Sequence, residues 1–162
     1  MVLWLAVFVV RLLLLARFAV SPDFIPNGDD MKFYDDWAQR ILRGQWTDGQ
    51  AFYGLPGYAY ALALLGGSPL TVGVLQCVFE AFTAVFLVRI GRQAFADVAG
   101  EFAAQGIGIA AAVGWMCFQP AQAFSVILMP TAWVVCAFWG LVCWILEGAR
   151  TATWRTGCPR TG

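Results

Sequence analysis

Residues 2–20 read VLWLAVFVVRLLLLARFAV, and this stretch decides what kind of protein the chain is. An α-helix rises about 1.5 Å per residue, so about 20 apolar residues are needed to cross the hydrocarbon core of a bilayer. A secretory signal peptide is the alternative. However, the stretch lacks a basic start, Arg11 interrupts its apolar run, and no clear A-x-A cleavage site follows. We therefore predict a retained membrane-spanning helix.

The composition of the whole chain agrees with a membrane protein. Of its 162 residues, 60% are hydrophobic and 12% are charged, and the mean hydropathy is +0.70. Soluble domains carry about twice that share of charge. The formal net charge is zero, which gives a nucleic-acid partner no electrostatic support. The sequence has no histidine, which excludes Ser/His/Asp and Cys/His catalysis and most zinc sites.

Outward from this first span, the apolar pattern predicts an all-α integral membrane fold. We expect about four membrane-spanning helices, with one or two short amphipathic surface helices in a long external loop. The third span is rich in glycine and alanine, which allows close contact between helices. In the fourth span, Pro130 is expected to cause a kink. The expected segments are spans at 2–20, 69–90, 98–116 and 123–146, the external loop 21–68, and an unstructured tail at 149–162.

Arginines predict the orientation. Arg89 and Arg92 lie in the short connection at 89–101, and more arginines lie in the tail. With four spans these two regions share one side of the membrane, which the positive-inside rule makes cytoplasmic. The N-terminus is then cytoplasmic too. The loop at 21–68 faces outward and holds six aspartates against one lysine and two arginines, a net charge of −3.

Two charged residues fall inside the predicted spans. Arg11 lies about 15 Å from the inner end of the first span, and Glu80 about 14 Å from the inner end of the second. Because the depths match, an Arg11–Glu80 ion pair would lower the cost of burying both charges. The alternative is that Arg11 extends to the interface and Glu80 is protonated or lines a cavity.

The external loop begins with an amphipathic pattern. Apolar residues recur every three to four positions from Met31 to Leu42, which predicts a short helix suited to the membrane surface. Asp29 or Asp30 is expected as its N-cap, and Gly44 as its stop. Residues 59–65 are too short to span and indicate a second surface helix or the lip of a cavity.

Two interpretations of Asp29 and Asp30 remain open at this point. One is helix capping on a solvated acidic loop. The other is a catalytic carboxylate at the membrane edge, where it can accept a proton from an incoming hydroxyl. A pair of carboxylates can also hold a hard divalent cation through its oxygens.

The order of these features resembles the N-terminal part of the GT-C membrane glycosyltransferases, the bacterial family 39-type group with the protein O-mannosyltransferases and aminoarabinose transferases. The shared pattern is a first span, an external loop that opens with an acidic pair, a helix, an aromatic segment with proline, and further spans. The resemblance covers roughly Leu5 to Glu147. It rests on Gly28-Asp29-Asp30, Tyr34, Trp37-Ala38, Ile41, Gly44, Leu55-Pro56-Gly57-Tyr58, and the stretches LQCVFEAFTAVFLVRIGRQAF and QPAQAFSVILMPT.

The resemblance implies transfer of a sugar from a polyprenyl-phosphate donor to a hydroxyl acceptor, on the outer face of a bacterial inner membrane. Asp30 would activate the acceptor hydroxyl and Asp29 would support it. These two residues would also hold any divalent cation, Mg²⁺ or Mn²⁺. Tyr53 and Tyr58 would line the sugar or lipid site, although anchoring at the interface is an equal reading of both.

The chain also departs from the family. Gly54-Leu55-Pro56 stands where many relatives carry a lysine on the lipid phosphate, so Arg40 and Arg43 would have to replace it. Family members have many more spans. The resemblance therefore implies that residues 1–148 are the N-terminal part of a GT-C-type domain, a fragment expected to be inactive alone. The alternative function is a small non-enzymatic membrane protein, such as a scaffold, assembly or transporter subunit with an acidic external loop.

Overall fold

The computed structural model describes residues 2–47 and 54–156. In this part of the chain it contains only helices and the loops that connect them, which confirms the all-α prediction. Helices α1, α4, α5 and α7 are long, and the others are short. The elements are α1 (Val2–Ala19), the 3₁₀ turn η1 (Pro22–Phe24), α2 (Asp29–Leu42), α3 (Pro56–Leu64), α4 (Pro69–Ala99), α5 (Glu101–Cys117), α6 (Gln119–Phe124) and α7 (Thr131–Thr156).

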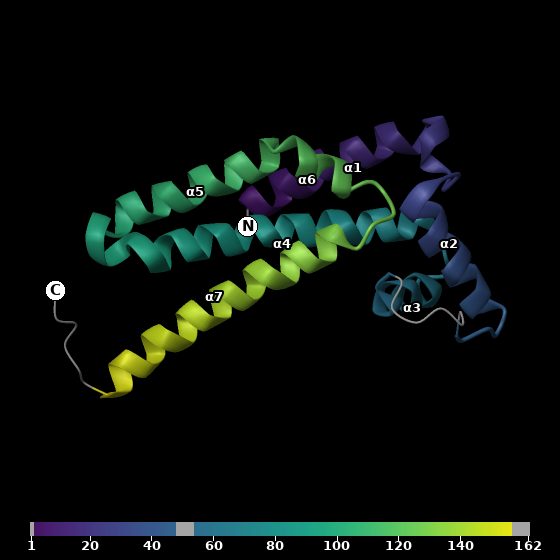
Figure 1. Cartoon of the computed structure of the whole chain (residues 1–162). Helices are drawn as coiled ribbons and strands as arrows, with labels where there is room; N and C mark the ends of the chain where they lie inside the picture. The colour runs from purple at the N-terminus through teal and green to yellow at the C-terminus, as the bar shows by residue number, and fades with distance from the viewer. Residues whose placement is uncertain (1, 48–53, 157–162) are drawn as a thin grey trace.

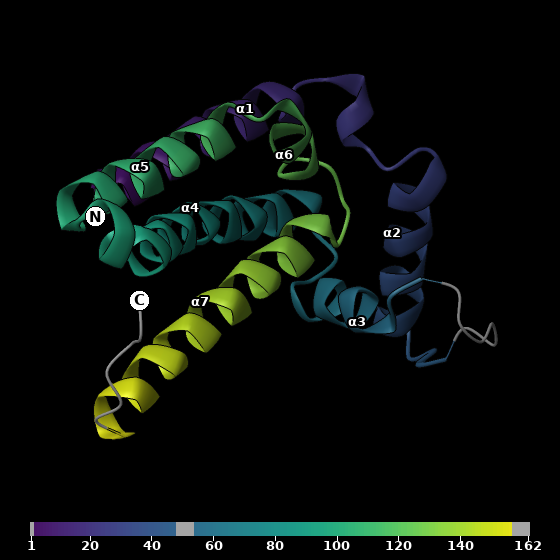
Figure 2. The same ribbon diagram turned by 60° about the vertical axis from the view of Figure 1, so that its left-hand side comes forward.

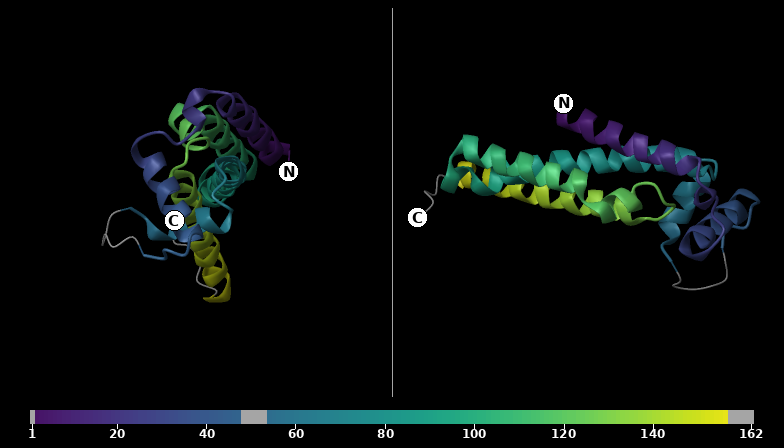
Figure 3. Two further views of the ribbon diagram at one scale, coloured as in Figure 1. Left: turned by 90° about the vertical axis from the view of Figure 1, so that its right-hand side faces the viewer. Right: turned by 90° about the horizontal axis from the view of Figure 1, so that it is seen from above.

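Helix α4 is the centre of the bundle. Helices α1, α5 and α7 each pack along it, as Figure 1 shows. The short helices α2 and α3 contact each other and lie together at one end of the bundle, where α2 runs across the direction of the long helices (Figure 2). The view from above confirms that both short helices stay at this end (Figure 3). We call it the α2–α3 end.

Among the residues that the structure describes, three helices are long and apolar enough to cross a membrane: α1, α4, and α7 over Thr131–Thr151. This indicates a multi-pass membrane protein. Helix α5, the expected third span, has 17 residues, which corresponds to a length of about 25 Å. It is therefore shorter than the hydrocarbon core of about 30 Å.

The second and third spans differ from the prediction at their shared boundary. We expected a connection at 89–101, but α4 continues to Ala99 and the chain turns at Gly100. The polar residues that suggested a connection are arginine, glutamine and aspartate. They are compatible with a helix that extends beyond the apolar core, since the stretch contains no proline and its one glycine, Gly91, lies inside the helix against α5.

The fourth span and the tail were also predicted wrongly. The span was expected from residue 123, but α6 ends at Phe124 and α7 begins at Thr131. Pro130 comes just before α7 and does not kink it, because proline lacks an N–H and is tolerated at a helix start. Residues 149–156 belong to α7 instead of an unstructured tail. Residues 157–162 lie outside the described part of the chain.

Helices α4 and α5 approach closely through two glycines. A Cβ atom on Gly91 would lie 2.5 Å from the Cα of Gly108, and one on Gly108 would lie 2.6 Å from the carbonyl oxygen of Val88. Ala104 and Ala112, one turn to either side of Gly108, are fully buried. The prediction of close helix contact from the small residues is thus confirmed.

The amphipathic pattern of α2 is confirmed as well, but its apolar face is covered by protein. Tyr34, Trp37, Ala38 and Ile41 are buried in a cluster with residues of α3, the start of α4 and the loop before α7. We expected this face to lie on the membrane surface. The contacts with α3 replace much of that membrane contact.

The N-terminal end of α2 differs from the prediction, and the C-terminal end agrees with it. Gly28, not an aspartate, is the N-cap, and Asp29 adopts a positive φ of 52°. At the other end, Gly44 has a φ of 88°. Its N–H donates to the carbonyl of Ile41 at 2.9 Å, and the N–H of Gln45 donates to Arg40 at 3.0 Å. This is the Schellman arrangement, and it confirms Gly44 as the stop.

Candidate functional site

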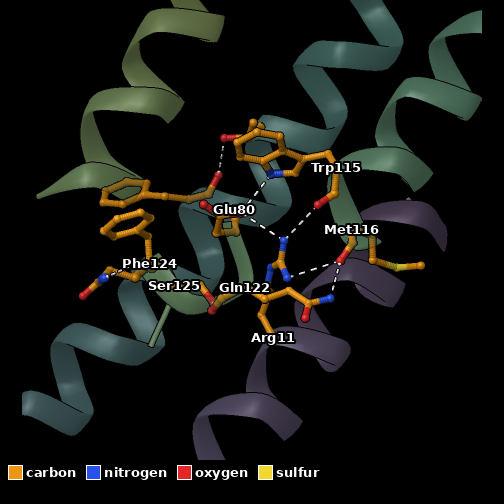
Figure 4. Close-up of polar contacts among 10 residues, drawn as sticks. Arg11, Glu80, Trp115, Met116, Gln122, Phe124 and Ser125 are labelled. Atoms are coloured by element: carbon orange, nitrogen blue, oxygen red, sulfur yellow. Dashed lines mark hydrogen bonds and ion pairs between the residues drawn. The ribbon is translucent and has the colours of Figure 1, made fainter. Parts of the chain in front are cut away.

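A buried ion pair joins α1 to α4 in the centre of the bundle. The Nη2 atom of Arg11 lies 3.3 Å from Oε2 of Glu80, and the exposed fractions of the two residues are 0% and 1%. The Arg11–Glu80 pair predicted from matching depths is therefore confirmed. Figure 4 shows the two side chains pointing towards each other.

Helix α5 ends at this ion pair. Arg11 donates from Nη2 to the carbonyl of Trp115 at 3.1 Å and from Nη1 to the carbonyl of Met116 at 3.3 Å, as seen in Figure 4. The last carbonyls of a helix have no partner within it and carry a partial negative charge. A guanidinium group supplies both the donors and the charge they need. The indole N–H of Trp115 in turn donates to Glu80 at 2.8 Å.

A second buried polar side chain holds the connection between α6 and α7. Gln76, one turn before Glu80 on α4, is fully buried. Its Nε2 atom donates to the carbonyls of Phe124 and Ile127, both at 2.9 Å. Non-helical backbone at membrane depth is tolerated only where its polar groups find partners in the protein. Gln76 provides the hydrogen-bond donor for two of these backbone carbonyls.

This polar cluster is defined by Arg11, Gln76, Glu80 and Trp115. Its ionic groups are enclosed and paired. Its hydrogen bonds tie α1, α4, α5 and the α6–α7 connection together. Because each charged group already binds other groups of the protein, the role of the cluster is structural: it holds the helices together.

The catalytic residues expected from the sequence lie elsewhere, at the α2–α3 end. Asp29 and Asp30 occupy the first turn of α2 and are both exposed. They are beside the membrane-spanning part of the bundle, since α1 and the 3₁₀ turn directly precede them. On the same helix, Asp36 is also exposed and Asp35 is half-buried. Burial and the neighbouring charge of Asp36 raise the pKa of Asp35, against a hydrogen bond with Gln39 that lowers it.

The expected substrate-binding residues are not brought together at the aspartates. Arg40 is half-buried in the last turn of α2, and Arg43 is its exposed C-cap residue. They lie at the opposite end of a 14-residue helix from Asp29, a distance of about 20 Å. Tyr53 lies outside the described residues.

Tyr58 is part of the aromatic core of the α2–α3 end. It is 5% exposed, and its ring makes edge-to-face contacts with Tyr34 and Trp133 at centroid distances of 5.0 and 5.5 Å. Burial raises the pKa of its hydroxyl above the usual value, and the Tyr34 hydroxyl adds to this. Among the described residues the Tyr58 hydroxyl has no hydrogen-bond partner.

The donor set at Asp29 and Asp30 does not fit a divalent cation held by the protein. Mg²⁺ takes six oxygen ligands in near-ideal octahedral geometry. The part of the chain that the structure describes has no group of three or more metal-ligating side chains. Two exposed neighbouring carboxylates leave most ligand positions to water, so no step of a mechanism is assigned to a metal.

Sequence reasoning missed Gln76 and Trp115. The signal for Gln76 was available, because it lies four residues before Glu80 in an apolar span and so shares its helix face. No signal pointed to Trp115, since its role depends on α5 ending at the depth of Arg11.

Comparison of the chain with protein-family models, curated proteins and solved structures finds no match. The chain's own residues and their geometry are therefore the basis for assigning a function.

Proposed function

We propose that this chain forms the N-terminal part of a GT-C-type membrane glycosyltransferase. The reaction is transfer of a sugar from a polyprenyl-phosphate donor to a hydroxyl acceptor. The observation that carries the proposal is the position of Asp29 and Asp30. The pair lies on the first turn of α2, which follows the first membrane helix after the 3₁₀ turn, and it is exposed at the α2–α3 end of the bundle.

The surrounding architecture supports the same reading. Two short helices, α2 and α3, fill the long loop between α1 and α4, which is the arrangement that the sequence resemblance leads one to expect. The backbone of Asp29 also has a positive φ of 52°, which is uncommon outside glycine, although aspartate adopts it more readily than most residues. Such conformations cluster at functional sites, where the surrounding structure has to maintain them.

In the proposed reaction, the carboxylate of Asp30 accepts the proton of the acceptor hydroxyl. The acceptor oxygen forms a bond to the anomeric carbon of the sugar, and the bond from that carbon to the phosphate oxygen breaks. The polyprenyl phosphate leaves with the electron pair. A water-exposed carboxylate is a weak base, so donor and acceptor would have to exclude water from Asp30 as they bind.

The proposed orientation follows from the distribution of arginines. Arg89, Arg92 and Arg150 gather at the end of the bundle opposite α2 and α3. The positive-inside rule places that end in the cytoplasm and the aspartates outside. The N-terminus is then cytoplasmic, and a bacterial inner membrane is the proposed location.

The decisive experiment is sugar transfer in native membranes of cells whose own copy of the gene carries Asp30→Asn. Loss of a general base lowers the rate about 10²–10⁴-fold, so we expect a loss in that range with the protein level unchanged on an immunoblot. The matched control is Asp36→Asn, which removes an exposed carboxylate from the same helix. Full transfer by the Asp30→Asn strain would end the catalytic assignment.

A second candidate function is a non-enzymatic membrane subunit. The specific observation that favours it is that both aspartates face solvent while the buried charges, Arg11 and Glu80, are paired with each other. Deletion of the gene separates the two functions. Glycosyl transfer that persists after deletion, together with loss of a partner membrane complex, identifies the subunit.

A further inference from the structure

A polar cavity of about 220 Å³ lies between α4 and α7, away from the α2–α3 end. Its lining holds three guanidinium groups and one carboxylate, and two further carboxylates, Asp97 and Glu101, pair with lining arginines from outside it. In Figures 1 and 2 the two helices diverge towards this end of the bundle. The lining residues are Arg89, Arg92 and Gln93 from α4 and Glu147 and Arg150 from α7.

Each arginine of the cavity has a carboxylate nearby, but these pairs are weak. Each is recorded at a distance longer than the 2.7–2.9 Å of a strong charge-assisted hydrogen bond. The paired carboxylates are 45–70% exposed, and exposed ion pairs contribute about 0–1 kcal/mol each. The guanidinium groups of Arg89 and Arg92 can therefore exchange their carboxylates for another anion. The pairs are Arg89–Glu147 at 3.7 Å, Arg92–Glu101 at 3.7 Å and Arg150–Asp97 at 3.4 Å.

The cavity lies at the depth of a headgroup layer. Arg89 is about 30 Å along α4 from Pro69, and Arg150 is about 28 Å along α7 from Thr131. Both helices start at the α2–α3 end, so the arginines are one hydrocarbon thickness away from it. Phosphate groups of the opposite leaflet are found at that level.

Exposed apolar side chains of α7 lie one to two turns before the cavity, on other faces of the helix than the lining residues Glu147 and Arg150. Trp144 is 70% exposed, and Leu141 and Ile145 are each more than half exposed. Exposed tryptophan is typical of the boundary between headgroups and hydrocarbon. Of these three side chains, Trp144 is the nearest to the lining face, about a quarter turn of the helix from it.

We propose that the α4–α7 cavity binds the phosphate of an anionic phospholipid, whose acyl chains lie along α7 near Trp144. Basic pockets between membrane helices suit such headgroups, because the arginines supply both charge and planar donors for phosphate oxygens. The proposal is independent of the glycosyltransferase function, since the cavity and the aspartates are at different ends of the bundle.

The test is lipid retention by the full chain in nanodiscs of phosphatidylcholine with a minor share of phosphatidylglycerol, read by native mass spectrometry. We expect phosphatidylglycerol to be retained over phosphatidylcholine. One basic residue near an anionic surface changes binding about fivefold, so Arg89→Gln and Arg92→Gln should each lower retention by about that factor. Arg17→Gln, which changes an exposed arginine on α1 outside the cavity, is the control for general attraction to the anionic surface, and each cavity variant should lower retention more than it does.

The variant Glu147→Gln separates lipid binding from a purely structural role. It removes the carboxylate that competes for Arg89 but keeps an acceptor for the hydrogen bond from Gln93. We expect retention of phosphatidylglycerol to rise about fivefold. If the arginine variants fail to fold, the retention measured with Glu147→Gln still tests whether the cavity binds the lipid.

Three outcomes would overturn the proposal. They are equal retention of the two lipids by the wild type, no rise with Glu147→Gln, and displacement of phosphatidylglycerol by added inorganic phosphate. The last outcome would reassign the cavity to a free phosphate.

Discussion

The guanidinium of Arg11 lies 3.3 Å from the carboxylate of Glu80, and the same guanidinium donates to the last carbonyls of α5. The Arg11 side chain therefore has two roles in an apolar environment. It neutralises a buried acid, and it completes the hydrogen bonding of a helix that ends within the bundle. Removing Glu80 leaves the charge of Arg11 without a partner, whereas removing Arg11 leaves the last carbonyls of α5 without donors as well. Mutation can therefore separate the two contributions.

Glu80→Gln is expected to destabilise the fold by about 3 kcal/mol, because breaking a buried pair leaves Arg11 as an uncompensated buried cation. Unfolding by sodium dodecyl sulfate in mixed micelles, followed by tryptophan fluorescence, measures the change. Glu101→Gln is the matched control, since its pair with Arg92 is exposed and should contribute about 1 kcal/mol or less.

The double variant Arg11→Met/Glu80→Gln should recover only part of that loss. It removes both charges, but the carbonyls of Trp115 and Met116 lose their donors. Wild-type stability of Glu80→Gln would contradict the ion pair. Complete recovery in the double variant would contradict the helix-end role of Arg11.

Gly108→Ala is expected to cost about 1–3 kcal/mol, the usual range for overpacking. Its new methyl group would lie 2.6 Å from the backbone carbonyl of Val88, and a backbone atom cannot move aside by changing rotamer. Gly106→Ala is the control on the same helix, where the methyl group meets nothing within 4 Å. That substitution should be neutral or stabilising by up to about 1 kcal/mol. Equal stabilities of the two variants would exclude close α4–α5 packing.

The sequence was sufficient where one local rule decides the structure. The α2 pattern from Met31 to Leu42 and the stop at Gly44 needed only helix periodicity and the left-handed preference of glycine. The Arg11–Glu80 pair followed from depth alone, because a buried charge in lipid needs a partner.

The errors arose where tertiary contacts decide. A run of polar residues after Arg89 looked like a loop, yet it belongs to α4, which continues to Ala99 and packs against α5 through Gly91. Pro130 marked the position before Thr131, but it was interpreted as a kink within one span and not as a break between two helices. The break is possible because Gln76 supplies donors to the backbone there, and that interaction spans two distant segments.

The proposed orientation predicts which end of the bundle is accessible from outside the cell. In a background without the native cysteines, Lys32→Cys on α2 should react with a membrane-impermeant maleimide in intact cells. Ala99→Cys at the end of α4 should react only after permeabilisation. Both original residues are exposed, so burial does not confound the comparison. The reverse pattern would place the aspartates in the cytoplasm and contradict the proposed site of sugar transfer.

Gln76→Leu tests whether hydrogen bonding or hydropathy dominates inside this bundle. Leucine is the more apolar residue, so hydropathy alone predicts a more stable protein. The substitution, however, removes the two hydrogen bonds at 2.9 Å to the carbonyls of Phe124 and Ile127. Gln76 is about 10 Å along α4 from its start, which is within the hydrocarbon layer, where water cannot replace the lost donors.

We therefore expect Gln76→Leu to destabilise the protein by about 2 kcal/mol, the cost of leaving buried acceptors without partners. Hydrogen exchange read by mass spectrometry should become faster in peptides from residues 118–130. Exchange in α2 should stay the same. Gln105→Leu on the exposed side of α5 gains the same apolar area without losing a recorded contact, so it isolates the hydropathy term. If both variants are equally stabilising, the α6–α7 connection does not depend on Gln76.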